Sequence, residues 1–268
     1  MCRVLQVKPA GYYAWLGRKP TRRQVSRLAL IERIRTVHQQ SRGTYGSPRV
    51  HRELAARGVS VCENTVAKVM KQQQIRSKIK RRFVLTTDSN HTQPPAANLL
   101  DRQFDVPLPD RVWCSDITFI PTRQGWLFLA LVMDLCSRRI VGWAMADHMR
   151  SELVCDALQM ALRRRRPGPG LLHHSDRGIQ YASGVYQDLL AEHGMICSMS
   201  RRGDCYDNAP TESVISTIKR ELVHHEDYAT HEQAKASIFE YIEVFYNRRR
   251  RHSAIGYQSP ESFEASLN

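Results

Sequence analysis

The stretch Trp113-Cys114-Ser115-Asp116-Ile117-Thr118 is the segment from which the fold of the second half of this 268-residue chain is predicted. It lies in the first of three strand-like segments, which are separated by short turn signals and span 112–121, 126–135 and 139–144. Side chains alternate between the two faces of a strand, so Asp116 is expected on the opposite face from Ile117. A carboxylate at a polar position in an otherwise apolar strand makes Asp116 a candidate functional residue.

Helices and strands alternate after these three segments. Helical periodicity predicts a helix over 151–165, which Pro167-Gly168-Pro169-Gly170 ends. Further patterns predict, in chain order, a strand at 171–174, a helix at 186–193, a strand at 195–199, a polar loop at 203–208, and helices at 211–224 and 230–246. This order of elements predicts an α/β domain with a mixed five-stranded sheet flanked by helices.

The first 83 residues are helical in pattern and basic. Apolar residues recur at helical spacing within 24–40. A second helix is expected to begin with Ser47 as its N-cap and Pro48 at its first position, and Gly58 suits the left-handed conformation that ends it. A third helix follows, so residues 47–74 have a helix-turn-helix-like outline, a pattern that any pair of packed helices also gives.

Three parts of the chain are therefore predicted. Residues 1–83 form a small all-helical basic module. Residues 84–107, which contain Pro94-Pro95 and show no clear periodicity, form a linker. Residues 108–268 form the α/β core with a helical and basic C-terminal tail.

The composition favours an anionic partner. The formal net charge is +14, from 40 Lys and Arg against 26 Asp and Glu, and such a balance is typical of nucleic-acid-binding proteins, although a merely basic protein shares it. No stretch approaches the roughly 18 apolar residues of a membrane span, and the first residues lack the apolar segment of a signal peptide. We therefore expect a cytoplasmic protein without membrane contact. The seven cysteines contain no Cys-x-x-Cys pair, which argues against a zinc ribbon or a disulfide framework.

Three acidic residues fall at the ends or starts of predicted elements. Asp116 lies in the first strand, Asp176 follows the short fourth strand, and Glu212 lies in the first turn of the helix that starts near Pro210. Cleavage of a phosphodiester needs an activated nucleophile and a stabilised leaving oxygen, and two divalent ions held by carboxylates supply both. Each acid taken singly has the alternative interpretation of a surface cap or ion-pair partner.

Several other polar and aromatic side chains lie in the same motifs as the three acids or elsewhere in the chain. Lys219 follows Glu212 by two helical turns and shares its face, where it could hold a phosphate or be an ordinary exposed lysine. Asp134 is expected to be structural, Asp207-Asn208 to shape the loop and cap the next helix, and His173 and His174 to pack at the strand end. The four tryptophans are expected in the core and not as platforms for bases: Trp15, Trp113, Trp126, Trp143.

Seven blocks of sequence together resemble the second-frame (OrfB) transposases of the bacterial IS-three family of insertion sequences, over nearly the whole chain. They are Gly11-Tyr12-Tyr13-Ala14-Trp15, Tyr45-Gly46-Ser47-Pro48-Arg49-Val50, Trp113-Cys114-Ser115-Asp116-Ile117-Thr118, Asp134-Leu135-Cys136-Ser137-Arg138-Arg139-Ile140-Val141-Gly142-Trp143, His174-Ser175-Asp176-Arg177-Gly178, Tyr206-Asp207-Asn208-Ala209, and Tyr246-Asn247 to His252 before Gly256-Tyr257.

The resemblance implies a ribonuclease H-like, integrase-type core behind a helix-turn-helix-like module. The family uses two aspartates and a glutamate, the last two separated by 35 residues, and a basic residue seven positions after the glutamate; Asp116, Asp176, Glu212 and Lys219 match these positions. It implies two Mg²⁺ ions, with Mn²⁺ able to substitute, and DNA as substrate: the terminal inverted repeats and the target. The residues expected to contact DNA are Lys219, Arg250, Arg248, Arg49, Lys80, Arg81 and Arg82.

Two departures from the family pattern keep alternatives open. Ser213-Val214-Ile215-Ser216 stands where family members often have aromatic residues, which indicates a packing change. The active family enzyme is typically a frameshift fusion with an upstream DNA-binding segment, which this sequence lacks. The chain is therefore expected to act as a homo-oligomer on paired ends, or as a catalytic half that needs the upstream product. The other hypotheses are a DNA-binding regulator without catalysis and a generic ribonuclease H-like nuclease.

Overall fold

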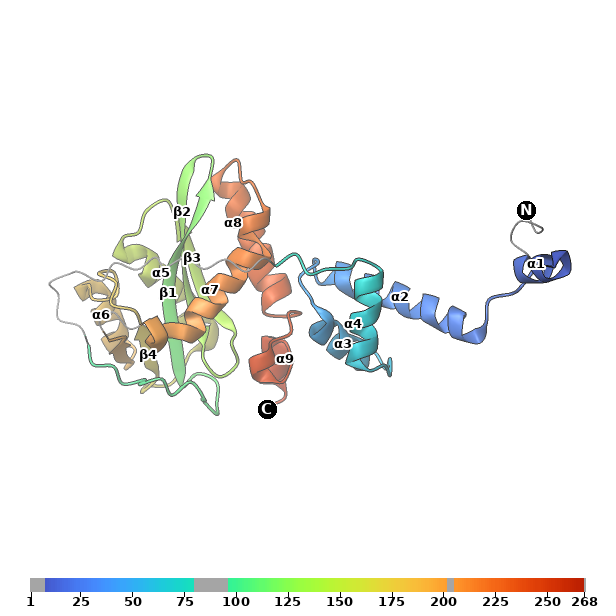
Figure 1. Ribbon diagram of the computed structural model, residues 1–268. Coiled ribbons are helices and arrows are strands. Elements are labelled where there is room, and N and C mark those ends of the chain that lie inside the picture. The colour runs from blue at the N-terminus through green and yellow to red at the C-terminus, as the bar shows by residue number, and fades with distance from the viewer. Residues whose placement is uncertain (1–7, 80–95, 202–204, 268) are drawn as a thin grey trace. The chain divides into compact units, whose positions relative to one another are not determined.

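The computed structural model describes residues 8–79, 96–201 and 205–267. The chain divides into two compact units, Met1–Lys78 and Ile79–Asn268, and each is described by itself (Figure 1). Lys80, Arg81 and Arg82, three of the predicted DNA contacts, lie outside the described residues. No helix of the described ranges is long and apolar enough to cross a membrane.

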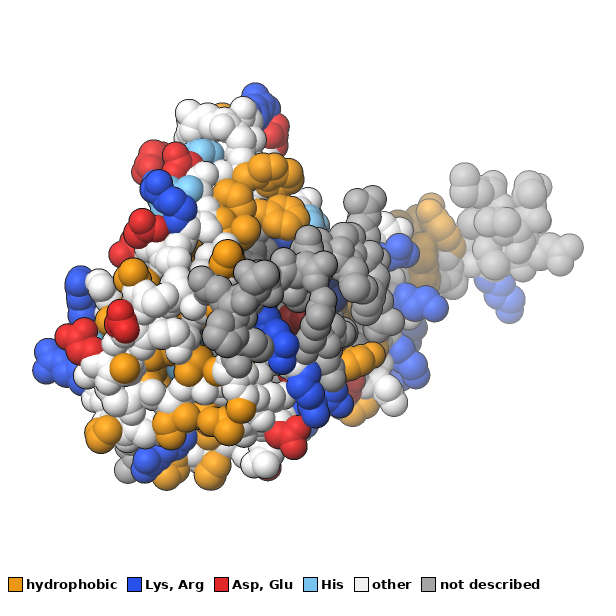
Figure 2. Space-filling view, turned by 90° about the vertical axis from the view of Figure 1, so that its left-hand side faces the viewer, with side chains coloured by type: hydrophobic (Ala, Val, Ile, Leu, Met, Phe, Trp, Pro, Cys, Tyr) orange, Lys and Arg blue, Asp and Glu red, His pale blue; other side chains and the backbone are white. Residues whose placement is uncertain are grey.

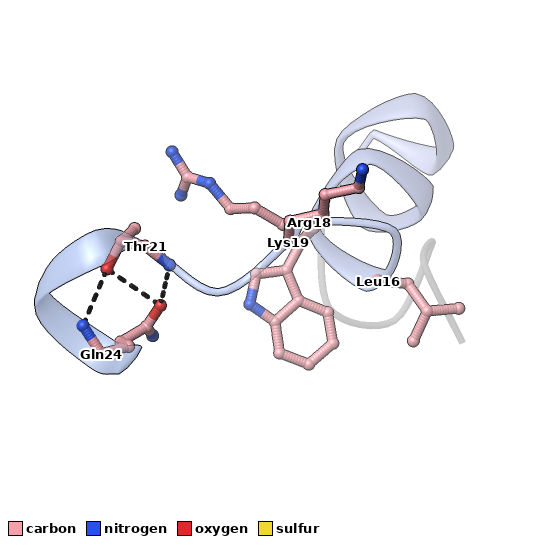
Figure 3. Close-up of a pocket in the computed structure, with 6 residues that line it drawn as sticks. Leu16, Arg18, Lys19, Thr21 and Gln24 are labelled. Atoms are coloured by element: carbon pink, nitrogen blue, oxygen red, sulfur yellow. Dashed lines mark hydrogen bonds between the residues drawn. The ribbon is translucent and has the colours of Figure 1, made fainter. Parts of the chain in front are cut away.

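The N-terminal unit is all-helical, as predicted. Its four helices are α1 (Pro9–Leu16), α2 (Arg22–Gln40), α3 (Ser47–Ala56) and α4 (Glu63–Gln72). At the start of α2 the Thr21 hydroxyl accepts from the Gln24 amide, and the Gln24 side chain accepts from Thr21, which forms a capping box (Figure 3). Helices α2, α3 and α4 bury a shared apolar core: Ile31, Ile34, Val37, Val50, Leu54, Val66, Val69, Met70.

Helices α3 and α4 form the expected helical pair. Gly58 ends α3 with a φ of +75°, the left-handed conformation for which its lack of a side chain suits it. The predicted cap at Ser47 is wrong by one residue, because Gly46 is the N-cap and no side chain caps this helix. Pro48 lies in the first turn, where its missing amide hydrogen costs no helical hydrogen bond.

The second unit contains the predicted mixed five-stranded sheet. Its strands run in the spatial order β3-β2-β1-β4-β5, with β1, β2 and β3 antiparallel and β1, β4 and β5 parallel. The bounds are β1 (Val112–Thr122), β2 (Gly125–Asp134), β3 (Ile140–Ala146), β4 (Leu172–Ser175) and β5 (Ile196–Met199). Each strand lies within two residues of its predicted bounds.

Helices flank the sheet (Figure 1). The α-helices are α5 (Ser151–Arg165), α6 (Gly184–Glu192), α7 (Ala209–Glu221), α8 (His231–Glu240) and α9 (Pro260–Ala265). Short turns of other helix types are η1 (Cys205–Asn208), η2 (Val223–His225), the π-helix η3 (Tyr241–Tyr246) and η4 (Ser253–Ile255). The predicted helix over 230–246 is thus an α-helix that continues as a π-helix.

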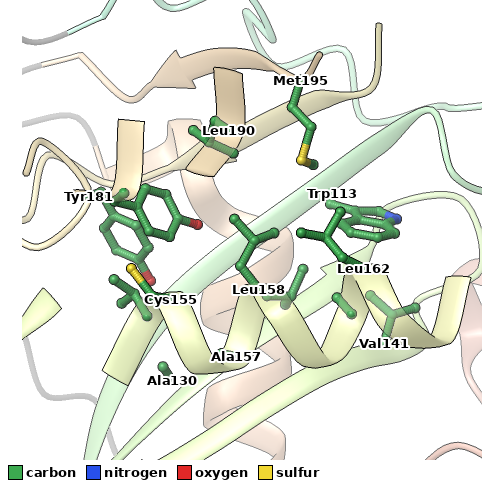
Figure 4. Close-up of a cluster of buried hydrophobic side chains, with 14 of the residues drawn as sticks. Trp113, Ala130, Val141, Cys155, Ala157, Leu158, Leu162, Tyr181, Leu190 and Met195 are labelled. Atoms are coloured by element: carbon green, nitrogen blue, oxygen red, sulfur yellow. The ribbon is translucent and has the colours of Figure 1, made fainter. Parts of the chain in front are cut away.

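Helix α5 packs directly on the sheet and forms the main core (Figure 4). Its Leu158 and Leu162 meet Trp113 from β1 and Val141 from β3 in one apolar cluster. Gly142 on β3 permits this close approach: a Cβ there would lie 2.2 Å from the carbonyl oxygen of Ala157 and 2.8 Å from the Cβ of Ala161.

The second half of the predicted linker instead packs on the core unit. Leu100 is buried, and the Ser198 hydroxyl at β5 accepts hydrogen bonds from the backbone amides of Leu99 and Leu100. Asn98 donates to the carboxylate of Asp207 at 2.9 Å. The polar, Pro-containing composition of 84–107 predicted a linker, whereas the residues near Leu100 pack against the core unit.

Arg250 is a buried structural residue, which corrects its predicted role in phosphate binding. Its side chain is 4% exposed and forms two hydrogen bonds of 2.9 and 2.7 Å with the carboxylate of Glu221 at the end of α7. The Tyr241 hydroxyl donates to the same carboxylate at 2.8 Å. An arginine so enclosed cannot reach a phosphate without breaking a buried ion pair.

Replacement of Gly142 by alanine is expected to destabilise the protein, because the added methyl group collides with the backbone of α5. Overpacking of this kind costs about 1–3 kcal/mol of unfolding free energy. Chemical denaturation of the variant measures this loss. Gly184→Ala is the matched control, since a Cβ at Gly184 meets no atom within 4 Å; equal stability of both variants would contradict the close packing of α5 on β3.

Arg250→Met is expected to lower the free energy of unfolding by about 3–5 kcal/mol, because it leaves the Glu221 carboxylate buried without a cation. The double variant Glu221→Leu/Arg250→Met should recover part of this loss. Arg123→Met is the control, since the Arg123–Asp227 pair is exposed and its loss should change stability little. A single Arg250→Met variant as stable as the wild type would show that the pair does not stabilise the fold.

Candidate active site

Asp116 lies where β1 leaves its parallel partner. Strands β1 and β4 pair only from Val112 to Ser115 on β1, so Asp116 is the first residue beyond the paired segment. Its carboxylate accepts a hydrogen bond from the amide of Ile117 at 2.7 Å, and the side chain is half-buried. Asp116 therefore lies on the central strand, paired with β2 on one side and just beyond the end of the pairing with β4 on the other.

Asp176 stands at the matching position of β4. Ser115 and Ser175 are partners in the parallel register, so the next residue of each strand is an aspartate. Neighbouring strands lie about 4.8 Å apart, which makes Asp116 and Asp176 neighbours at one sheet edge. The Asp176 carboxylate accepts from the amide of Gly178 at 2.9 Å. A Cβ at Gly178 would lie 3.0 Å from that oxygen, so a glycine fits this turn.

Glu212 is brought to the aspartates by the start of α7. The Asn208 side-chain amide donates to the carbonyl oxygen of Ser115 at 3.2 Å, which attaches the first turn of α7 to β1 next to Asp116. Thr211 is buried in the same turn. The exposed Glu212 follows on the solvent side of the helix. Sequence reasoning missed this role of Asn208, since a contact to a backbone carbonyl leaves no pattern.

The three carboxylates act on one another electrostatically. The pKa of Asp116 is raised well above its ordinary value by burial and by the charges of Asp176 and Glu212, while Lys219 opposes the shift. Partial burial and Asp176 likewise raise the pKa of Glu212. An all-oxygen donor set with excess negative charge suits hard divalent cations such as Mg²⁺. Within the described ranges, however, no three His, Cys, Asp or Glu side chains are close enough to hold one ion together.

Lys219 lies beside this acidic group, on the same helix as Glu212. Its ammonium nitrogen stands 4.3 Å from the centroid of the Phe119 ring. Burial lowers the pKa of Lys219, and the charge of Asp116 opposes that shift. The predicted proximity of Lys219 to the acids is therefore present in the structure.

Asp207 fixes the loop before α7, but it does not cap the helix. Its buried carboxylate accepts from the backbone and guanidinium of Arg201, from Arg102 and from Asn98. The hydrogen bonds to Arg201 hold the pKa of Asp207 well below its ordinary range. Asn208 occupies the predicted N-cap position of α7, but its side chain makes no capping hydrogen bond.

His173 and His174 are packing residues, as predicted. The Nε2 atom of His173 lies 2.8 Å from the Ser115 hydroxyl and 3.0 Å from the Tyr186 hydroxyl. Burial lowers the pKa of His173 to about 3 and that of His174 to about 4, so both rings are neutral. Asp134 is also structural: its buried carboxylate accepts from Ser137 and from the amide of Asp110.

Arg248 and Arg49 are the other predicted DNA contacts among the described residues. Arg248 is largely exposed and 3.9 Å from the carboxylate of Glu261. Arg49 on α3 is half-buried, with its guanidinium over the ring of Tyr45. A separate hollow in the N-terminal unit contains none of the three acids (Figure 3) and is lined by Trp15, Leu16, Arg18, Lys19, Thr21 and Gln24.

Two of the four tryptophans are not core residues, contrary to the sequence prediction. Trp113 is fully buried in the main cluster, and Trp143 is half-buried and donates to Glu243 at 2.8 Å. Trp15 is 69% exposed and Trp126 is 54% exposed. Whether a side chain is buried depends on which other elements pack over it, and the local sequence does not show which elements these are.

Protein-family models match both units. An HTH-like domain model matches residues 26–83, and two integrase core domain models match residues 107–205 and 193–260. Among solved structures, the simian T-cell lymphotropic virus intasome in complex with PP2A regulatory subunit B56 gamma matches with a TM-score of 0.50 and 12% identity, covering 85% of this chain and 73% of that chain. The match confirms the ribonuclease H-like, integrase-type fold.

Curated relatives match almost the whole chain. It is 44% identical over 263 residues to the insertion element IS600 uncharacterized 31 kDa protein of Shigella sonnei, covering 98% of this chain and 97% of that protein. It is 42% identical over 266 residues to the transposase InsF for insertion sequence IS3A of Escherichia coli strain K12, covering 98% and 92%. At this identity over nearly its full length, the chain belongs to the IS3 family of insertion-sequence transposases.

Proposed function

We propose that this transposase cleaves and joins DNA at insertion-sequence ends through Asp116, Asp176 and Glu212. The observation that carries the proposal is the register of β1 and β4, in which paired Ser115 and Ser175 each precede an aspartate. Helix α7, attached to the carbonyl of Ser115 through Asn208, adds the glutamate. The separation of 35 residues between Asp176 and Glu212 agrees with this assignment.

The three carboxylates are proposed to hold two Mg²⁺ ions, which Mn²⁺ can replace. Bound there, the ions would supply Lewis-acid activation of the attacking hydroxyl and stabilisation of the leaving oxygen. Asp116 lies within β1 and Asp176 directly follows β4, so the sheet fixes the backbone positions of both donors. Lys219 offers a cation for a phosphate of the DNA end. No covalent bond between protein and DNA is required, because water and then a freed 3′-hydroxyl act as nucleophiles.

The DNA partner is proposed to be the terminal inverted repeats and the target. A net charge of +14 favours a polyanion, and the helical pair α3–α4 carries the half-buried Arg49. Arg248 is an exposed cation on the second unit. Lys80, Arg81 and Arg82 are also proposed to contact DNA, on the basis of the sequence alone. A homo-oligomer on paired ends, with or without an upstream-frame partner, is the proposed active form.

A DNA-binding regulator without catalysis is the second candidate function. The net charge of +14 and the helical pair α3–α4 support this candidate. Such a regulator would need the helical unit and the basic residues, but not the acids. DNA binding that survives chelation, without joining by any preparation, would favour it.

Asp116→Asn and Glu212→Gln are expected to reduce strand joining by at least about a hundredfold while leaving DNA binding within a few-fold of wild type. The assay uses labelled element ends with Mg²⁺ or Mn²⁺, with and without the upstream-frame protein. Glu232→Gln, an exposed acid on α8, is the control that should keep full joining. Wild-type rates of joining in the Asp116→Asn protein would exclude the proposed triad.

Lys219→Gln is expected to weaken binding to element ends and to reduce the slope of log affinity against log salt by about one, because one phosphate contact is lost. Fluorescence anisotropy over a salt series measures the slope. Lys235→Gln on α8 provides a charge-matched control and should leave the slope unchanged. An unchanged slope in the Lys219→Gln protein would assign Lys219 a role other than phosphate binding.

A further inference from the structure

Two aromatic side chains are exposed on the β1–β2 hairpin, beyond the part of the sheet that forms the core. Phe119 is 37% exposed and Trp126 is 54% exposed. In the register of the hairpin, Phe119 pairs with Phe128 and Pro121 pairs with Trp126, so Phe119 and Trp126 lie on the same face. Their ring centroids are 4.9 Å apart in an edge-to-face arrangement. We call this pair the hairpin platform.

Other apolar side chains on the same face of the hairpin are covered, so the exposure of Phe119 and Trp126 does not follow from the face on which they lie. Phe128 lies directly across from Phe119 and packs against the main core, and Ile117, two residues before Phe119, does the same. Apolar side chains on this face of the hairpin are therefore covered up to Phe119 and uncovered beyond it. Figure 2 shows one of several patches of hydrophobic side chains in the upper part of the second unit, at the height that the β1–β2 hairpin and α8 share in Figure 1.

The platform adjoins the acidic site through Lys219. The Lys219 ammonium stands over the Phe119 ring at 4.3 Å, and the same charge acts on Asp116. Phe119 follows Asp116 by three residues, about 10 Å along the strand, and the two side chains leave opposite faces of β1. Lys219 is therefore the group that connects the aromatic pair with the acids, since it contacts the Phe119 ring and its charge acts on Asp116.

We propose that the hairpin platform stacks an unpaired nucleobase of the DNA in the acidic site, while Lys219 neutralises the adjoining phosphate. Every base has an aromatic face, so such stacking does not require a particular sequence. The cation beside the ring favours an anionic partner over an apolar protein surface. This assignment rests on the proposed binding of DNA at Asp116, Asp176 and Glu212.

The test places the fluorescent base 2-aminopurine in turn at each terminal position of a labelled element end, in chelator so that no cleavage occurs. An aromatic ring stacked on this base quenches its fluorescence. At one position the complex with Trp126→Leu or Phe119→Leu is expected to be brighter than the wild-type complex, and affinity is expected to fall about tenfold. Trp126→Phe, which keeps a ring, should stay quenched.

Phe239→Leu is the matched control, because Phe239 is an exposed phenyl group in edge-to-face contact with Trp143 on another part of the unit. Its complex should stay as quenched as the wild type. Thermal melting of each variant establishes that it is folded, so that a loss of quenching can be assigned to the missing ring.

Equal fluorescence at every position in the wild type and in Trp126→Leu would overturn the platform. So would a Trp126→Leu protein that loses only self-association in sedimentation, since the pair would then be an interface between copies. Strand joining separates this proposal from the triad. If DNA ends are joined but the variants show no fluorescence change, the platform is rejected and the triad is kept. If the fluorescence change is seen but no preparation joins DNA, the triad is rejected and the platform is kept.

Discussion

The parallel pairing of β1 with β4 is the contact on which the rest of this structure depends. It joins the antiparallel strands β1 to β3 to the parallel pair β4 and β5, so the sheet is continuous only through it. The same pairing ends at Ser115 and Ser175 and leaves Asp116 and Asp176 as neighbours. The pairing of β1 with β4 therefore both holds the sheet together and brings the two candidate catalytic aspartates together. A shift of register by one residue would turn one aspartate to the other face of the sheet.

A buried layer of neutral polar groups supports these strand ends. His173 meets the hydroxyls of Ser115 and Tyr186, and His174 meets those of Ser198 and Ser200. Burial keeps both imidazoles neutral at ordinary pH, so they add no positive charge behind the acids. Among the groups that shift the pKa of Asp116, the Ile117 amide and the charge of Lys219 offset the negative charge of the other two carboxylates. Such a field favours binding of divalent cations and phosphate together.

Much of the sequence that carries the family resemblance is structural in this protein. Asn247 receives a hydrogen bond from the amide of Ile140 and donates to its carbonyl, so its side chain satisfies the backbone of the edge strand β3. Asp134 holds the turn between β2 and β3, and Asp207 joins three chain segments around the loop before α7. These contacts set the positions of the elements that bear the acids. Much of the family resemblance therefore comes from residues that stabilise the fold.

The sequence by itself predicted most of the secondary structure and the sheet class, because these depend on local periodicity. The three acids are candidates that rest on their positions in predicted elements and on the family resemblance. Only the tertiary structure decided which polar and aromatic side chains are covered. Arg250 belongs to a basic run that predicts phosphate contacts, yet it is buried against Glu221, which lies 29 residues earlier. Leu100 belongs to a segment without periodicity, yet it packs beside β5. Trp126 has the residue type of a core position but lies beyond the reach of the covering helices. Burial and pairing are properties of contacts between distant segments, and those contacts form only when the sheet and its helices assemble.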